Sequence, residues 1–153
     1  MIAEQLLSDD AKIRIEDELR QAELNTSAEI RVHIEDECKE LVLDRATFIF
    51  SELKMHKTEL RNGILIYAAF KDKKLAVIGD VGINVQVREN FWNDVKDIMI
   101  DSFKKSEYES GIIQGVRMVG EKIKSAFPIQ SNDKNELANK VSEGRDFNSK
   151  KSK

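Results

Sequence analysis

The sequence GILIYAAF occupies residues 63–70 and carries the strongest structural signal in the chain. Every position is apolar or small, so neither of its two alternating faces is polar. This is typical of a central strand that helices cover on both sides. Residues 71–73 then predict a tight polar turn, and residues 74–79 predict a second strand that pairs back on the first as a hairpin. The run is also far shorter than the roughly 20 residues that span a bilayer, so we expect no membrane span.

Upstream of this run, the pattern predicts a parallel neighbouring strand. Ile30, Val32 and Ile34 alternate with polar side chains, which is the period of a strand with one wet face at or near a sheet edge. An apolar stripe within residues 40–55 predicts a helix that connects this strand to the central one, with Arg45 on its polar side. Because two strands joined through a helix are parallel, the hairpin makes the small sheet mixed.

Three further helices are expected around the sheet. Residues 8–24 have helical spacing after an N-cap serine, and a second amphipathic segment follows at about residues 91–103. Residues 108–111 predict a break, and residues 112–127 predict a last helix that ends before the only proline. The sequence therefore predicts an α/β domain with helices on both faces of a small mixed sheet.

The C-terminal part of the chain has a different composition. Residues 131–153 are mostly polar with a few scattered apolar side chains, too few to anchor an element. We therefore place one domain at residues 1–130 and a flexible polar tail at residues 131–153. We expect deletion of this tail to leave the melting temperature nearly unchanged.

Composition and motifs exclude several function classes. The chain has 25 basic and 28 acidic residues and no basic stripe, which argues against nucleic acid as a partner. The usual phosphate-loop, dinucleotide, zinc-protease and hydrolase-elbow motifs are absent from the sequence. We expect His33 and His56 to be surface residues without a metal role, and Cys38 to be a bystander. The single cysteine and the lack of a secretory leader predict a cytoplasmic location.

Polar side chains are expected to converge at one end of the sheet. With two parallel strands and an antiparallel third, Glu29, Arg61, Asn62 and Asp80 lie at the same end. Hard cations such as calcium bind carboxylate and amide oxygens gathered from separate loops. The sequence Gly-Asp-x-Gly around Asp80 is also an ordinary turn signal, so a ligand role and a structural role both stay open for this residue.

Four short segments follow one another along the chain: Thr26–Val32, Arg61–Ile66, Gly79–Ile83 and Gly111–Val116. In this order they resemble the TPM domain family, which includes thylakoid-lumen proteins linked to photosystem II repair and acetylcholine-receptor modulators. The resemblance spans roughly residues 8–128. It implies a three-layer α/β/α sandwich with a Rossmann-like arrangement, and a phosphatase or divalent-cation-binding activity. It also implies that the matching positions Glu29, Asn62 and Asp80 are the metal ligands, with calcium as the expected cation.

Two functions remain open from the sequence. The first is a non-catalytic accessory module that binds another protein, with a divalent cation at Glu29, Asn62 and Asp80 that stabilises the loops. The second is a metal-assisted phosphatase acting on phosphate monoesters, in which Arg61 steadies the phosphate. No catalytic residue is assigned in the first case, and the identity of the partner and the oligomeric state are left open.

Overall fold

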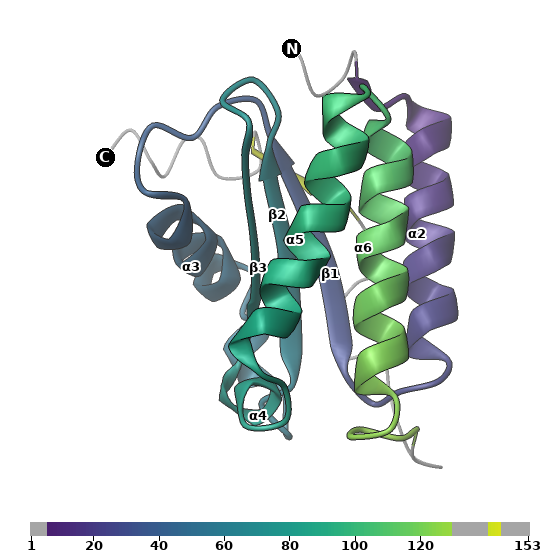
Figure 1. Ribbon diagram of the computed structural model, residues 1–153. Helices are drawn as coiled ribbons and strands as arrows, with labels where there is room; N and C mark the ends of the chain where they lie inside the picture. Colours follow the sequence, from purple (N-terminus) through teal and green to yellow (C-terminus); the bar gives the residue numbers. More distant parts are fainter. Residues whose placement is uncertain (1–5, 130–140, 145–153) are drawn as a thin grey trace.

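The computed structural model describes residues 6–129 and 141–144, which form a four-stranded mixed sheet between two layers of helices (Figure 1). The strands are β1 (Glu29–Glu35), β2 (Gly63–Ala69), β3 (Lys74–Gly79) and β4 (Ser142–Glu143), in the spatial order β3-β2-β1-β4. The parallel pairing of β1 with β2 and the antiparallel hairpin of β2 with β3 are confirmed.

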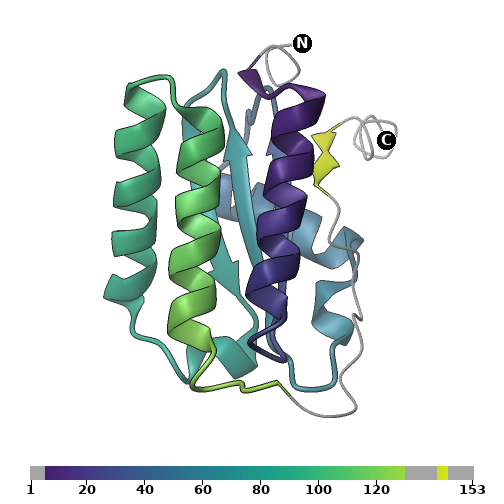
Figure 2. The same cartoon turned by 90° about the vertical axis from the view of Figure 1, so that its right-hand side faces the viewer.

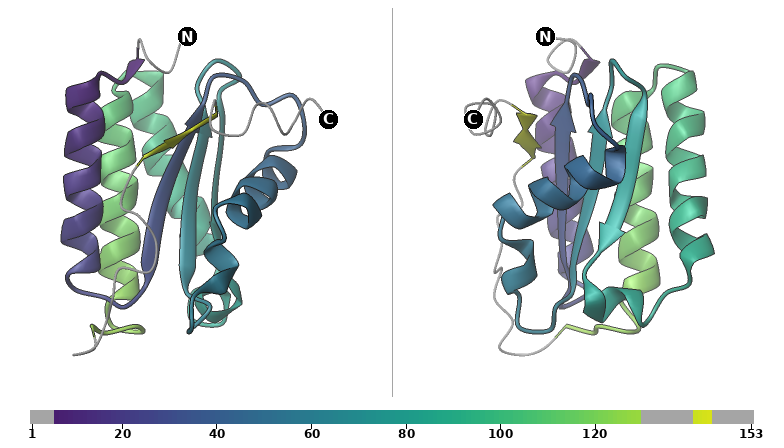
Figure 3. Two further views of the ribbon diagram at one scale, coloured as in Figure 1. Left: turned by 180° about the vertical axis from the view of Figure 1, so that it is seen from behind. Right: turned by 90° about the vertical axis from the view of Figure 1, so that its left-hand side faces the viewer.

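Helices cover both faces of the sheet, as predicted. Helices α2 (Asp9–Glu23), α5 (Glu89–Lys104) and α6 (Tyr108–Ile123) lie side by side over one face (Figure 2). Helix α3 (Val42–Glu52) crosses the other face, followed by the short helix η1 (Met55–Lys57) (Figure 3). A one-turn helix, α4 (Val81–Asn84), follows β3 at the lower end of the sheet in Figure 1. The three-layer α/β/α sandwich is therefore confirmed.

The hydrophobic core has two parts, one on each face of the sheet. Even-numbered residues of β1 and β2, such as Ile30 and Ile64, pack with buried residues of α2, α5 and α6. Odd-numbered residues of β2, such as Leu65 and Tyr67, pack with α3 and η1. The central strand β2 is buried at every position, which is why its sequence shows no polar alternation.

Helix α6 begins earlier than the sequence indicated. Residues 108–111 were expected to break the helical pattern, but they form its first turn. Gly111 lies in this turn and allows α5 to approach it closely, because a Cβ atom there would lie 2.6 Å from the ring of Phe103. The glycine therefore marks a helix contact and not a break.

Strand β1 lies near the sheet edge, as predicted, but it has no half-exposed face. All seven of its residues are buried, and it lies between β2 and β4. Helix α3 covers the face that carries the polar side chains. There Glu35 accepts hydrogen bonds from Arg45 and lies within ion-pair distance of His33, which makes the burial of these groups tolerable. The prediction of a wet face was therefore wrong.

Part of the predicted tail belongs to the sheet. His33 and Ile34 of β1 pair with Ser142 and Glu143 of β4 in parallel, and Val141 is buried. The expectation that residues 131–153 form no element is therefore wrong for β4. The remainder of the predicted tail, residues 131–140 and 145–153, lies outside the described residues, so the domain boundary stays a prediction.

Within residues 6–129 and 141–144, the longest helices, α5 and α6, have 16 residues each, and no helix combines the length and apolarity of a membrane span.

Candidate functional site

The structure brings Glu29, Asn62 and Asp80 to the same end of the sheet. Glu29 is the first residue of β1 and stands opposite Gly63 of β2, and its backbone N–H donates to the carbonyl of Asn62 at 3.2 Å. Asp80 directly follows β3, and its backbone N–H donates to the carbonyl of Gly63 at 2.9 Å. The predicted convergence of the three segments is therefore confirmed at the level of the backbone.

The carboxylate of Asp80 is held by protein donors. It accepts hydrogen bonds from Arg61 Nε at 2.7 Å and from Arg61 Nη2 at 2.8 Å, in the paired geometry that suits a guanidinium and a carboxylate. It also accepts from the backbone N–H of Val81 at 2.7 Å and so caps α4. The structural turn role that the sequence left open for Asp80 is therefore present.

Gly82 fixes the loop before β2 against α4. Its backbone N–H donates to the carbonyl of Arg61 at 2.9 Å, and a Cβ atom at this position would lie 2.3 Å from the carbonyl oxygen of Leu60. Any side chain would push the two segments apart. The second glycine of the Gly-Asp-x-Gly sequence thus permits a close approach of backbone to backbone.

Asn62 is buried and links two loops. Its side-chain Nδ2 donates to the carbonyl of Ser27 at 3.2 Å, and its backbone N–H donates to Oγ1 of Thr58 at 3.1 Å. These bonds tie the loop before β2 to the loop before β1. Asn62 therefore helps to set the register at which both strands begin.

Glu29 is paired with another acid. The pKa of Glu23 is raised to about 8, mainly by burial and also by the charge and hydrogen bond of Glu29. The backbone N–H of Ile30, which donates to Glu23 at 2.9 Å, acts in the opposite direction and lowers this pKa. The Glu23–Glu29 pair therefore holds a proton more tightly than an isolated glutamate does. Each predicted ligand thus has its own protein partner, and residues 6–129 and 141–144 contain no group of three or more His, Cys, Asp or Glu placed to hold a metal ion.

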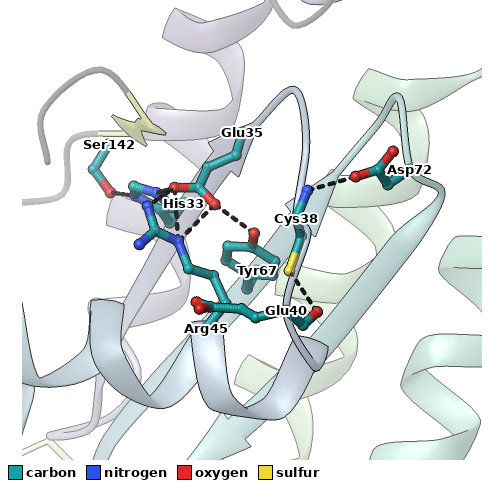
Figure 4. Close-up of polar contacts among 8 residues, drawn as sticks. All are labelled: His33, Glu35, Cys38, Glu40, Arg45, Tyr67, Asp72 and Ser142. Carbon is teal, nitrogen blue, oxygen red and sulfur yellow. Dashed lines mark hydrogen bonds and ion pairs between the residues drawn. The ribbon is translucent and has the colours of Figure 1, made fainter. Parts of the chain in front are cut away.

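A second polar cluster lies beneath α3, around the carboxylate of Glu35 (Figure 4). Arg45 donates to both oxygens of Glu35, with Nε at 3.1 and 3.0 Å, and the hydroxyl of Tyr67 donates to Oε2. Burial alone would raise the pKa of Glu35, but the hydrogen bonds from His33, Arg45 and Tyr67 outweigh it and lower this pKa to about 2. Burial, together with the neighbouring carboxylate, raises the pKa of the Tyr67 phenol.

His33 belongs to this cluster and is fully buried. Its Nδ1 atom lies 2.8 Å from Oγ of Ser142, its Nε2 atom lies 3.3 Å from Oε1 of Glu35, and its ring stacks on that of Tyr67. The prediction that His33 is a surface residue was therefore wrong. So was the placement of Arg45 on the polar side of its helix, since it is 2% exposed.

Cys38 lies beside the same cluster and contacts both its own loop and the β2–β3 hairpin (Figure 4). Its backbone N–H donates to Asp72 at 2.7 Å and its Sγ atom donates to the carbonyl of Glu40 at 3.4 Å. The thiol is buried. These contacts secure the loop between β1 and α3.

The chain was compared with known families and solved structures. The family model of the TPM domain matches residues 2–122. The NMR structure of the BA42 protein from the psychrophilic bacterium Bizionia argentinensis is 39% identical, with a TM-score of 0.84 over 90% of this chain and 95% of that one. The solution NMR structure of the N-terminal domain of a protein from P. gingivalis shares the fold at 17% identity, with a TM-score of 0.66 over 80% of this chain and 79% of that one. A search of the curated proteins finds no match. The order of segments, the sandwich of three layers and the family match agree, and this chain belongs to the TPM domain family.

Proposed function

We propose that this TPM domain is a binding module that docks a protein partner at the end of the sheet where β1 and β2 begin. The observation that carries the proposal is an exposed aliphatic surface beside the Arg61–Asp80 ion pair. Its members are Leu60, Val81 and Val85, which are 43%, 58% and 79% exposed. We call these three residues the aliphatic patch.

The aliphatic patch belongs to a rigid frame. Val81 and Val85 are four residues apart on the turn of α4, and Leu60 lies in the segment whose carbonyls contact Gly82. The paired hydrogen bonds of Arg61 and Asp80 join the two segments beneath them. A preformed apolar surface loses little conformational entropy on binding, which supports a docking role.

The chemistry of the patch suggests the kind of partner. Three aliphatic side chains bury best against an apolar group. The Arg61 side chain is 49% exposed beside them, so its outer face can meet an acidic group at the rim. We therefore propose a protein segment with apolar side chains flanked by a carboxylate.

A photo-crosslinking side chain at position 85 tests this docking surface in the cells that express the protein. The matched control carries the same side chain at Ile13, which is 54% exposed on α2. We expect one partner to be captured from position 85 and not from position 13. In calorimetry, Val85→Asp should then weaken binding of that partner at least tenfold and Ile13→Asp should not. Equal capture from both positions, or equal affinity of both variants, would refute the docking surface.

The proposal includes a divalent cation, calcium, at Glu29, Asn62 and Asp80. Carboxylate and amide oxygens from three neighbouring segments are the ligands that calcium prefers. A cation would have to replace Arg61 at the carboxylate of Asp80, and the half-exposed Arg61 side chain can turn toward solvent. Calcium binding and the Arg61–Asp80 pair are therefore expected to compete.

This competition gives a sharp test by thermal melts with EDTA, calcium, magnesium and manganese. Calcium should raise the melting temperature of the wild type, and Asp80→Asn should remove the effect because it deletes the charge and keeps the size. Arg61→Gln should increase the affinity for calcium, because it removes the competing cation. If calcium changes none of the melting temperatures, the cation is not part of the function.

The same geometry supports binding over phosphatase action. A metal-assisted phosphatase would use Asp80 for the metal and Arg61 for the phosphate. In the structure the two side chains hold each other, so neither is committed to a ligand. Release of p-nitrophenol from its phosphate ester, with calcium or magnesium, that is lost in both Asp80→Asn and Arg61→Gln would favour the phosphatase instead.

A cytoplasmic location is also part of this proposal. The single cysteine of the chain, Cys38, is buried and is not in a disulfide. Proteins of reducing compartments keep their thiols in this form. Fractionation of the source cells tests the location, and recovery of the protein in an extracytoplasmic fraction would refute it.

A further inference from the structure

A cavity of about 460 Å³ lies at the opposite end of β2 from the aliphatic patch. It opens between the β2–β3 hairpin and the loop that joins α5 to α6. Its volume is in the range of pockets that hold small molecules. Its lining includes Phe70, Phe103 and Tyr108 on one side and Lys73, Lys74 and Lys104 on the other.

One side of the cavity is an aromatic wall. The ring of Phe70 meets that of Tyr108 at a centroid distance of 4.8 Å and that of Phe103 edge-on at 5.6 Å. Phe103 and Tyr108 are themselves 5.5 Å apart. Because each ring contacts the other two, the wall is fixed before any ligand arrives, and its faces suit a flat apolar group.

The polar side of the cavity is positively charged. Three of its lining residues are lysines, Lys73, Lys74 and Lys104, and none is acidic. The ammonium group of Lys74 donates to the carbonyls of Cys38 at 2.8 Å and Glu40 at 3.0 Å, in the loop before α3, so this charge is held away from the cavity. Lys73 and Lys104 are exposed and can turn toward a ligand at the mouth.

Two acids near the hairpin, Asp72 and Glu37, have other partners. Asp72, in the hairpin turn, accepts the backbone N–H of Cys38 at 2.7 Å. Glu37 pairs with Lys71 at 2.8 Å. The two exposed lining lysines, Lys73 and Lys104, are the cations available for an anion.

From the aromatic wall and the two exposed lysines we infer that this cavity binds a small molecule with a flat aromatic body and an anionic head, either a phosphate or a carboxylate. The ring lies against Phe70, Phe103 and Tyr108, and the head meets the ammonium groups of Lys73 and Lys104 through charge-assisted hydrogen bonds. This site is separate from the proposed docking surface and does not depend on it.

Titration of the full chain with 1-naphthyl phosphate and with 1-naphthoate, followed by amide NMR spectra, tests the site. Both compounds should shift the amide signals of residues 69–75 and 100–108 and leave those of residues 60–62 and 80–85 unchanged. Neutral 1-naphthol lacks the anion and inorganic phosphate lacks the ring, so each should bind at least tenfold more weakly. Shifts spread over the whole surface, or 1-naphthol binding as tightly as the two anions, would overturn the inference.

Charge-removing variants provide the second arm. Lys104→Gln and Lys73→Gln should each weaken binding of 1-naphthyl phosphate about tenfold. The matched control is Lys105→Gln, which removes the same charge next to Lys104 at a position that does not line the cavity. Equal affinity of Lys104→Gln and Lys105→Gln would show that general charge, and not this cavity, attracts the anion. Melting curves of all three variants should match the wild type, because all three lysines are exposed.

Discussion

The Oγ atom of Ser142 lies 2.8 Å from Nδ1 of His33, although 109 residues separate them in sequence. The contact joins the short strand β4 to the buried side of β1. Lys12 of α2 holds the same strand through an ion pair with Glu143. A two-residue strand has few backbone bonds of its own, so these side chains are expected to decide whether it stays in place.

Ser142→Ala should lower stability by about 1–3 kcal/mol, because it removes a partner of a buried imidazole nitrogen. Urea denaturation monitored by circular dichroism measures this. Ser51→Ala is the control, since Ser51 is exposed on α3 and its loss should change little.

Removing residues 131–153 should also lower the melting temperature, contrary to the expectation from sequence. An unchanged melting temperature would mean that β4 contributes nothing to the fold.

Glu35→Gln should destabilise the protein strongly at neutral pH. It leaves Arg45 buried without its counter-charge, a loss of about 3–5 kcal/mol. The pKa of Glu35 is about 2 in the folded state against an ordinary value of 4.5, so its stabilisation is complete above pH 4.5 and is lost as pH falls toward 2. The difference between wild type and variant should therefore shrink between pH 5 and pH 3.

Urea titrations of Glu35→Gln at pH 7, 5 and 3 check this pH dependence. Glu59→Gln, at an exposed position before β2, is the matched control and should follow the wild type at each pH. A constant difference between Glu35→Gln and the wild type across the three pH values would contradict the low pKa.

Glu23→Gln should have the opposite pH dependence. The pKa of Glu23 is raised from 4.5 to about 8, so the folded protein keeps a proton that the unfolded chain releases, and wild-type stability falls as pH rises from 4.5 to 8. Glutamine resembles the protonated acid and has no such loss. Between pH 5 and pH 8.5, the free energy of unfolding of the variant should therefore rise relative to that of the wild type by roughly 1–3 kcal/mol. The size of this change also depends on Glu29, because the two acids titrate as a pair. Parallel urea curves at the two pH values measure the gain, and its absence would show that Glu23 is ionised in the fold.

Gly82→Ala should destabilise the loop beneath the aliphatic patch by about 1–3 kcal/mol, because the new methyl group overlaps the carbonyl of Leu60. Its φ angle is negative, so the loss would come from the contact and not from backbone strain. Asn84→Ala, on the same helical turn, is a control that removes only a hydrogen bond to the carbonyl of Gly79. Amide exchange of residues 60–62 and 80–85 should accelerate in Gly82→Ala more than in Asn84→Ala. Equal exchange rates in both variants would contradict a clash between the new methyl group and the carbonyl of Leu60.

The central strand and its pairing could be predicted because local sequence determines them. A run that is apolar on both faces, residues 63–70, must lie inside, and a three-residue polar turn permits only a hairpin partner. The helices followed from their apolar stripes for the same reason. The convergence of Glu29, Asn62 and Asp80 then followed from strand direction alone.

The buried polar cluster could not be predicted in this way. A strand with polar residues at alternate positions usually faces water, and nothing local shows that Arg45 and Tyr67 will cover Glu35 with matching hydrogen bonds. β4 was missed because its short pairing depends on His33, far away in sequence. Asp80 was assigned a possible ligand role because its guanidinium partner is set by the three-dimensional register of two loops.

The parallel pairing of β4 with β1 also has a consequence for the order in which the protein is made. β1 is complete once residue 35 has been synthesised, but its outer hydrogen-bonding edge receives Ser142 and Glu143 only when more than a hundred further residues have followed. During that interval the growing polypeptide has one sheet edge without its last strand. Such edges can pair with other chains, so ribosome-bound intermediates that end before residue 142 should be the species most in need of a chaperone.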